Sequence, residues 1–195
     1  MWDSIGGSEG TRVQNWTGRD ISYYSRMFQG GIVVQAVVKS WPNYQATPAS
    51  YVAHIWDRDE ESEIALQEIG YTHPLGPQVD ILMGGGRCYF IPQSVEGSCR
   101  EDDIDAVEIA KGYKYSFFQD MIAFGEKQQL PYLGLFTLDH MSYEVDRDPT
   151  KEPSLTEMAI KALDDLYSAT RKSEKGFFIM VEASRIVGTL NRGEA

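Results

Sequence analysis

A glutamate ends the last apolar run of the sequence, and its position makes it a candidate for chemistry. Glu182 follows the five apolar residues 177–181, a run typical of a strand buried on both faces. A carboxylate at the end of a buried strand needs a hydrogen-bond partner or a cation. Two interpretations are open: Glu182 caps a helix or forms a salt bridge, or it binds a hard metal ion such as Mg²⁺, which prefers oxygen ligands.

A threonine and an arginine in the first third of the chain form a second candidate pair. Thr47 precedes a proline and suits the N-cap of a helix, and Arg58 lies eleven residues further on. The planar guanidinium of an arginine suits bidentate binding of phosphate. Arg58 is also flanked by Asp57 and Asp59, so a surface ion pair is the alternative interpretation.

Glycines, cysteines and histidines define what other sites the sequence allows. The triple glycine 84–86 permits either a tight turn or a close approach of backbone to a ligand, but it lacks the spacing and the Lys-Ser/Thr of a P-loop. Cys88 and Cys99 have ten residues between them, which fits either a disulfide formed in an oxidising compartment or two buried thiols. The three histidines have no zinc-binding spacing.

The candidate residues must be positioned by an alternation of strands and helices. Strands are predicted at 31–38, 79–83, 133–136 and 177–181, and helices at 17–28, 47–56, 59–69, 103–111 and 154–171. Because the strands are apolar on both faces, we expect one mostly parallel sheet with helices on both sides. Ligands bind at the carboxyl ends of such strands, where 84–86 and Glu182 lie.

The helix predicted at 154–171 has the clearest pattern in the chain. Ser154 and Glu157 have the spacing of a capping box. The apolar residues that follow form one stripe of helical period, which should pack on a face of the sheet. Its members are Leu155, Met158, Ala159, Ala162, Leu163 and Leu166.

Composition narrows the classes of partner. The 195 residues carry a net charge of −11, which argues against a nucleic-acid partner because phosphate backbones attract basic surfaces. No run reaches the roughly 18 apolar residues that a membrane-spanning helix needs. The first ten residues lack a signal-peptide pattern, so either the chain is cytosolic or its original N-terminus is missing.

Five ordered segments together resemble one protein family. They are 46–58, 80–87, 135–147, 153–158 and 176–182, and they resemble the alkaline phosphatases, with the eukaryotic, fungal branch looking closest. The resemblance implies an incomplete copy of that family's α/β fold, with a mostly parallel central sheet and helices on both faces. It divides the chain into a poorly patterned segment 1–30, a partial alkaline-phosphatase-like domain 31–186 and a divergent tail 187–195.

The resemblance also implies roles for individual residues. Thr47 and Glu182 take the positions of magnesium ligands, and Arg58 takes the position of the arginine that grips the substrate phosphate. Gln45 and Ala183 depart from the family pattern. The reaction of the family is hydrolysis of phosphate monoesters through a phosphoserine intermediate, with two zinc ions stabilising the entering and leaving oxygens.

The departures bear most on zinc. Val187 and Asn191 stand where the family has a zinc-binding aspartate and histidine, and the later zinc ligands and the early aspartate that bridges zinc and magnesium have no counterpart. Ser4, after Asp3, is a partial echo of the nucleophile. We therefore expect the chain alone to be inactive, or to be a non-catalytic fragment that at most binds phosphate or a divalent cation weakly.

The family is commonly homodimeric and vacuolar, secreted or membrane-attached.

Overall fold

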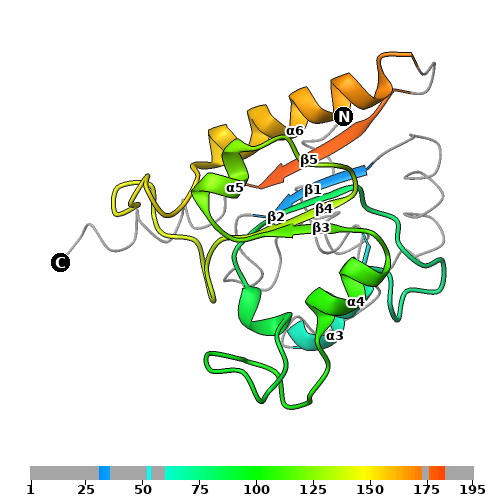
Figure 1. Ribbon diagram of the computed structural model, residues 1–195, viewed down its shortest axis with the longest axis vertical. Coiled ribbons are helices and arrows are strands. Elements are labelled where there is room, and N and C mark those ends of the chain that lie inside the picture. The colour runs from blue at the N-terminus through cyan, green and yellow to red at the C-terminus, as the bar shows by residue number, and fades with distance from the viewer. Residues whose placement is uncertain (1–30, 36–51, 54–59, 173–175, 183–195) are drawn as a thin grey trace, which may run out of the picture.

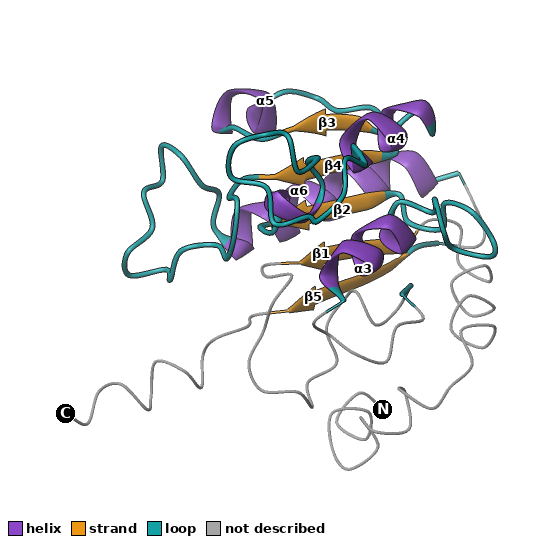
Figure 2. Cartoon of the chain, turned by 90° about the horizontal axis from the view of Figure 1, so that it is seen from below, coloured by secondary structure: helices purple, strands orange, loops and turns teal. Residues whose placement is uncertain are grey.

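Five parallel strands form the centre of the molecule (Figures 1 and 2). The computed structural model describes residues 31–35, 52–53, 60–172 and 176–182, with the backbone alone for 31–35 and 182. The strands are β1 (Gly31–Gln35), β2 (Ile81–Gly84), β3 (Ser116–Phe118), β4 (Tyr132–Leu135) and β5 (Phe178–Glu182). Their order in the sheet is β3-β4-β2-β1-β5, and every neighbouring pair is parallel.

Helices cover both faces of this sheet. On one side lie α3 (Glu61–Glu68) and α4 (Ala106–Gly112), and on the other lie α5 (Met121–Gly125) and α6 (Leu155–Thr170), as Figure 1 shows. A short 3₁₀ helix, η2 (Arg87–Tyr89), follows β2. In the described part of the chain, no helix is long and apolar enough to cross a membrane.

Alternate residues of the central strands feed two separate cores. Leu82 and Leu133 are paired in register and pack with α3 and α4, whereas Ile81 and Tyr132 form the next pair and pack with α6. The first core consists of Val52, Ala65, Leu66, Ile69, Val79, Leu82, Phe90, Ala106, Val107, Ala110, Tyr115, Leu133 and Leu135. The second consists of Ile81, Met83, Phe118, Phe124, Tyr132, Phe136, Met141, Met158, Ala162 and Leu166. Burial on both faces explains why β2 and β4 have no polar alternation.

The predicted strands 79–83, 133–136 and 177–181 are confirmed with shifts of one or two residues, and the strand predicted at 31–38 is confirmed over its described part. The helices predicted at 59–69, 103–111 and 154–171 are confirmed as α3, α4 and α6. The helices predicted at 17–28 and 47–56 lie mainly or wholly outside the described residues. The sequence analysis missed β3 and α5, because three and five residues are too few to show a period.

The prediction that the 177–181 strand is buried on both faces is wrong for the described structure. β5 ends the strand order, residues 177–180 of the predicted strand are only half-buried, and Val181 is 43% exposed. Similarly, Leu163 is exposed on α6, although it was predicted to lie in the buried stripe. An apolar sequence allows a strand or helix position to be buried, but its burial depends on which elements lie beside it.

A buried tyrosine joins β4 to α6. The Tyr132 side chain is fully buried, and its hydroxyl donates to Oδ2 of Asp165 at 3.1 Å. Lys161 Nζ lies 5.8 Å from the centre of the same ring and 3.4 Å from Asp165 Oδ2. Burial, reinforced by the negative charge of Asp165, raises the pKa of Tyr132. The hydroxyl therefore stays protonated and serves as a donor that fixes the helix on the strand.

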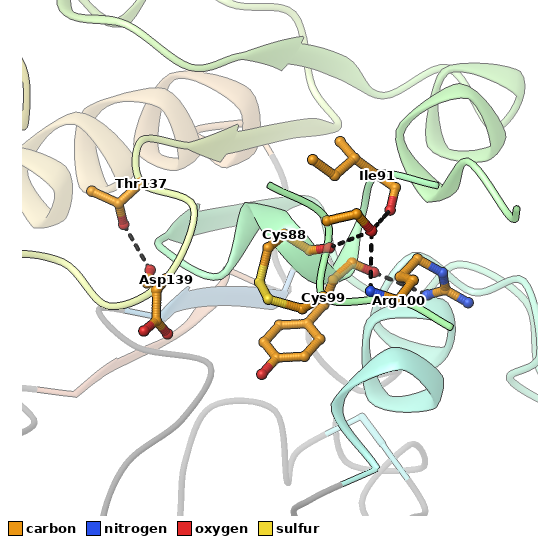
Figure 3. Close-up of a disulfide and its surroundings, with 8 residues drawn as sticks. Cys88, Ile91, Cys99, Arg100, Thr137 and Asp139 are labelled. Atoms are coloured by element: carbon orange, nitrogen blue, oxygen red, sulfur yellow. Dashed lines mark hydrogen bonds between the residues drawn. A yellow bond between two sulfur atoms is a disulfide. The ribbon is translucent and has the colours of Figure 1, made fainter. Parts of the chain in front are cut away.

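The two cysteines form a disulfide, which decides between the two interpretations of their spacing. The Cys88–Cys99 bond closes the loop after β2, and the Cys99 N–H donates to the Cys88 carbonyl at 2.9 Å (Figure 3). Ser98 Oγ closes the loop further by donating to the Ile91 carbonyl at 2.7 Å. The loop is therefore held by a covalent bond and by hydrogen bonds across it.

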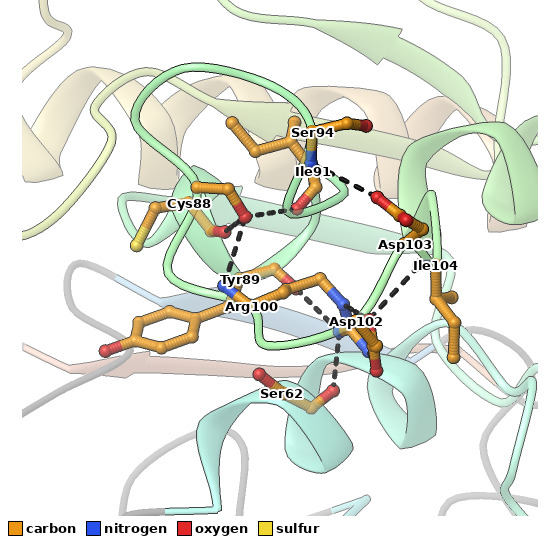
Figure 4. Close-up of polar contacts among 10 residues, drawn as sticks. Ser62, Cys88, Tyr89, Ile91, Ser94, Arg100, Asp102, Asp103 and Ile104 are labelled. Atoms are coloured by element: carbon orange, nitrogen blue, oxygen red, sulfur yellow. Dashed lines mark hydrogen bonds and ion pairs between the residues drawn. The ribbon is translucent and has the colours of Figure 1, made fainter.

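A buried arginine anchors the end of this loop (Figure 4). The Arg100 side chain is 1% exposed, and its guanidinium donates to both carboxylate oxygens of Asp102, at 2.6 and 2.8 Å. Its remaining nitrogen donates to the carbonyls of Ser62 and Tyr89. A buried cation must be compensated by its neighbours, so these contacts are costly to lose. Since Ser62 belongs to α3 and Tyr89 to η2, they fix the position of α3 relative to η2.

The capping box predicted for α6 is present. Ser154 Oγ accepts from the Glu157 N–H at 3.1 Å, and the Glu157 carboxylate accepts from the Ser154 N–H at 2.7 Å. The hydrogen bonds that the N–H and the hydroxyl of Ser154 donate to the Glu157 carboxylate lower the pKa of that carboxyl. The box thus satisfies N–H groups at the start of the longest helix.

We expect Ser154→Ala to lower the free energy of unfolding by about 1 kcal/mol, because the cap is lost. Ser168→Ala, on the exposed side of the same helix, is the control and should be neutral or slightly stabilising. Urea unfolding of both variants measures the difference, which should shrink as the pH falls through the lowered pKa of Glu157. Equal effects of the two substitutions would contradict the assignment of the cap.

Candidate functional site

The last residues of β1 and β5 meet at the carboxyl edge of the sheet. Gln35 is the register partner of Glu182, so the two backbones lie side by side where the strands end (Figure 1). The backbone of Glu182 thus has the strand-end position that the sequence predicted.

The other predicted site residues lie outside the described part of the chain. This applies to Thr47 and Arg58, and also to Ser4, Val187 and Asn191. The convergence of Thr47, Arg58 and Glu182 on one site therefore stays a prediction. Among the described residues, no group of three or more His, Cys, Asp or Glu side chains could hold a metal ion.

The triple glycine at the end of β2 forms a tight turn that packs on the loop after β4. A Cβ on Gly85 would lie 2.3 Å from the Asp139 carbonyl oxygen and 2.6 Å from Thr137 Oγ1. Gly86 adopts a φ of 77°, a conformation that favours glycine. Of the two interpretations of 84–86, the described contacts therefore support the structural turn.

Three consecutive N–H groups fix the loop after β2 to the loop after β4. Gly86, Arg87 and Cys88 donate to the carbonyls of Asp139, Thr137 and Leu138 respectively, at 2.8 to 3.0 Å. The hydroxyl of Thr137 also donates to the Asp139 carbonyl, at 2.8 Å (Figure 3). The two loops form one connected structure at the edge where ligands of parallel sheets bind.

An arginine that the sequence analysis did not single out lies at this edge. The Arg87 guanidinium donates through Nη1 to Gln119 Oε1, which follows β3. Partial desolvation lowers the pKa of Arg87. β3 and β5 are four strand spacings apart, roughly 19 Å at about 4.8 Å each. Arg87 is thus held toward β3, away from Glu182 at the other end of the sheet. Its sequence signals were its place directly after the glycines and its place at the end of segment 80–87, which resembles the family.

We expect Gly85→Ala to lower the free energy of unfolding by about 1–3 kcal/mol, since an added methyl would clash with the backbone of the neighbouring loop. Gly112→Ala is the matched control, because a Cβ built there has no atom within 4 Å apart from its chain neighbours and the backbone of its own helix, and the residue ends α4. That control should be neutral or stabilising by up to about 1 kcal/mol. Urea unfolding measures both, and an unaffected Gly85→Ala variant would show that the two loops are not closely packed.

Comparisons with known proteins give one consistent family. A family model described as alkaline phosphatase matches residues 29–190. The chain is 43% identical over 162 residues to an alkaline phosphatase of Schizosaccharomyces pombe, covering 80% of this chain and 29% of that protein. It is 40% identical over 156 residues to the repressible alkaline phosphatase of Saccharomyces cerevisiae, covering 72% of this chain and 27% of that protein.

Solved structures agree with these sequence matches. The crystal structure of Thermus thermophilus alkaline phosphatase superposes with a TM-score of 0.66 and 27% sequence identity, over 86% of this chain and 32% of that one. A cold-active alkaline phosphatase from a Shewanella species gives a TM-score of 0.63, with 25% identity. This chain spans less than a third of the length of the two yeast relatives. With the family model covering residues 29–190 and both yeast relatives at 40% identity or more, the chain belongs to the alkaline phosphatase family.

Proposed function

We propose that this chain carries part of a site for hydrolysing phosphate monoesters, in which Arg58 binds the substrate phosphate and Thr47 and Glu182 bind magnesium. The observation that carries the proposal is the family match, which extends from residue 29 to residue 190 and so spans all three positions. The position of the Glu182 backbone at the carboxyl end of β5 supports it, since ligands of parallel sheets bind at that edge.

The donor set suits the proposed ion and substrate. A threonine hydroxyl and a glutamate carboxylate are oxygen ligands of the kind Mg²⁺ takes, with waters completing its shell. Bound there, magnesium would supply positive charge close to the phosphate group. Arg58 would hold two oxygens of the phosphate through its guanidinium, which orients the group and balances its charge.

Two positions support the further proposal that this polypeptide does not turn over substrate by itself. Val187 is aliphatic and has no ligand atom, and the neutral amide of Asn191 is a group that zinc rarely accepts. Zinc in this family would supply an acidified water and stabilise the reacting oxygens. Arg58 alone binds ground state and transition state alike, which does little for turnover. The alternative function is therefore a non-catalytic one, in which the chain binds phosphate or a divalent cation weakly.

We expect the purified protein to bind inorganic phosphate weakly and to retain no tightly bound zinc after dialysis. Arg58→Ala should lower the phosphate affinity at least about tenfold, because the bidentate contact is lost. Arg171→Ala, at the exposed end of α6, removes the same charge elsewhere and should leave binding unchanged. Titration calorimetry with phosphate measures both variants.

Release of phosphate from an activated aryl phosphate tests the absence of turnover. We expect no release above the Arg58→Ala background, with or without added zinc and magnesium. Val187→Asp should not restore it, because one aspartate does not make a zinc site. Stoichiometric zinc together with turnover in the unmodified chain would overturn the proposed inactivity, and equal phosphate binding by both arginine variants would overturn the role of Arg58.

A further inference from the structure

The last residue of α3 is a buried acid that the proposed function does not use. The Glu68 side chain is 2% exposed, and its Oε1 atom has no hydrogen-bond partner. It belongs to the layer in which Leu66 and Ile69 pack against the sheet. A carboxyl group in such surroundings is stable when neutral, since an ionised carboxylate would lose its hydration without compensation.

Among the described residues, no cation is found to compensate a charge on Glu68. The Tyr115 hydroxyl donates to the Val79 carbonyl. It interacts electrostatically with two acids, Asp80 just before β2 and Glu68 itself. Arg100 contacts the opposite end of α3, at the Ser62 carbonyl, and it is bound there to Asp102. Burial raises the pKa of Glu68 from 4.5 to about 8.

We propose that a proton on Glu68 is part of the folded state, and that its release in the alkaline range loosens the packing of α3 on the sheet. At neutral pH the folded chain holds this proton while the unfolded chain has lost it. The Glu68 proton therefore contributes to the free energy of unfolding. This contribution is fully present below pH 4.5, falls as the pH rises, and is gone above about pH 8.

The location of α3 gives this proton a consequence for the site. Arg58 precedes α3 by three residues in the sequence, so the helix is the nearest described anchor of the segment that carries it. Deprotonation of Glu68 would weaken that anchor. This consequence rests on the proposed function, whereas the proton itself does not, because it follows from the burial of Glu68.

Unfolding by urea, without substrate or metal, tests the proton independently of the proposed function. Between about pH 5 and about pH 8 the unfolding equilibrium constant of the wild type, relative to that of Glu68→Gln, should rise by up to about tenfold per pH unit. A glutamine keeps the shape of the neutral acid and cannot ionise. Glu63→Gln is the control on the same helix, since that side chain is only half-buried and accepts a bond from Gln67, and it should keep the wild-type pH dependence.

A second measurement needs no variant that folds. Infrared spectra of the wild type should show the band of a protonated carboxyl at neutral pH, and the band should disappear as the pH passes about 8. Absence of that band at neutral pH would overturn the proposal, and so would a Glu68→Gln variant whose stability follows the same pH curve as the wild type. If Glu68→Gln does not fold, the infrared result alone decides.

Discussion

The parallel hydrogen-bond ladder from β3 to β5 is the constraint on which the rest of the structure depends. Parallel strands require crossover connections, and here these place α3 and α4 on one face and α5 and α6 on the other. Because all five strands run in one direction, their carboxyl ends lie at one edge. The shared strand direction therefore places Gln35, the glycines 84–86 and Glu182 at the same edge. Nearly a hundred residues separate 84–86 from Glu182 in the sequence.

The loops at this edge are built as a rigid unit around β2 and β4. Backbone hydrogen bonds from residues 86–88 to 137–139 join them, and the absence of a side chain at Gly85 lets the two backbones approach. The Cys88–Cys99 disulfide and the Arg100 cluster extend the same unit to α3. A functional group at a strand end needs support of this kind, because its geometry is only as fixed as the loops beside it.

Arg87 and the proposed magnesium ligand Glu182 lie at different ends of the sheet edge. Arg87 is directed toward Gln119 and β3, whereas the magnesium ligand proposed at Glu182 belongs to β5 at the far end of the sheet. The connected loops therefore lie on the β3 side of the edge, away from the Glu182 backbone. Glu68 is buried on α3, the helix that follows the segment containing Arg58 in the sequence.

The sequence by itself determined the elements with strong local signals and the family. Ser154 and Glu157 specify a helix start through atoms three residues apart, and the apolar runs at 79–83 and 133–136 specify strands buried on both faces. Ordered motifs identified the alkaline phosphatase family, because a family pattern is written in residue types and not in coordinates. The three-residue strand β3 and the five-residue helix α5 gave no periodic signal and were missed.

Only the tertiary structure decided the features that depend on residues distant in sequence. The place of β5 at the end of the strand order, the exposure of Leu163, the pairing of Cys88 with Cys99 and the burial of Glu68 all depend on which elements lie opposite each residue. The local sequence limits which environments a side chain can occupy, but it does not fix which of them the side chain has in the fold. Whether a carboxyl group keeps its proton, or a glycine meets another backbone, is decided by contacts across the fold, and these form only when the sheet brings distant segments together.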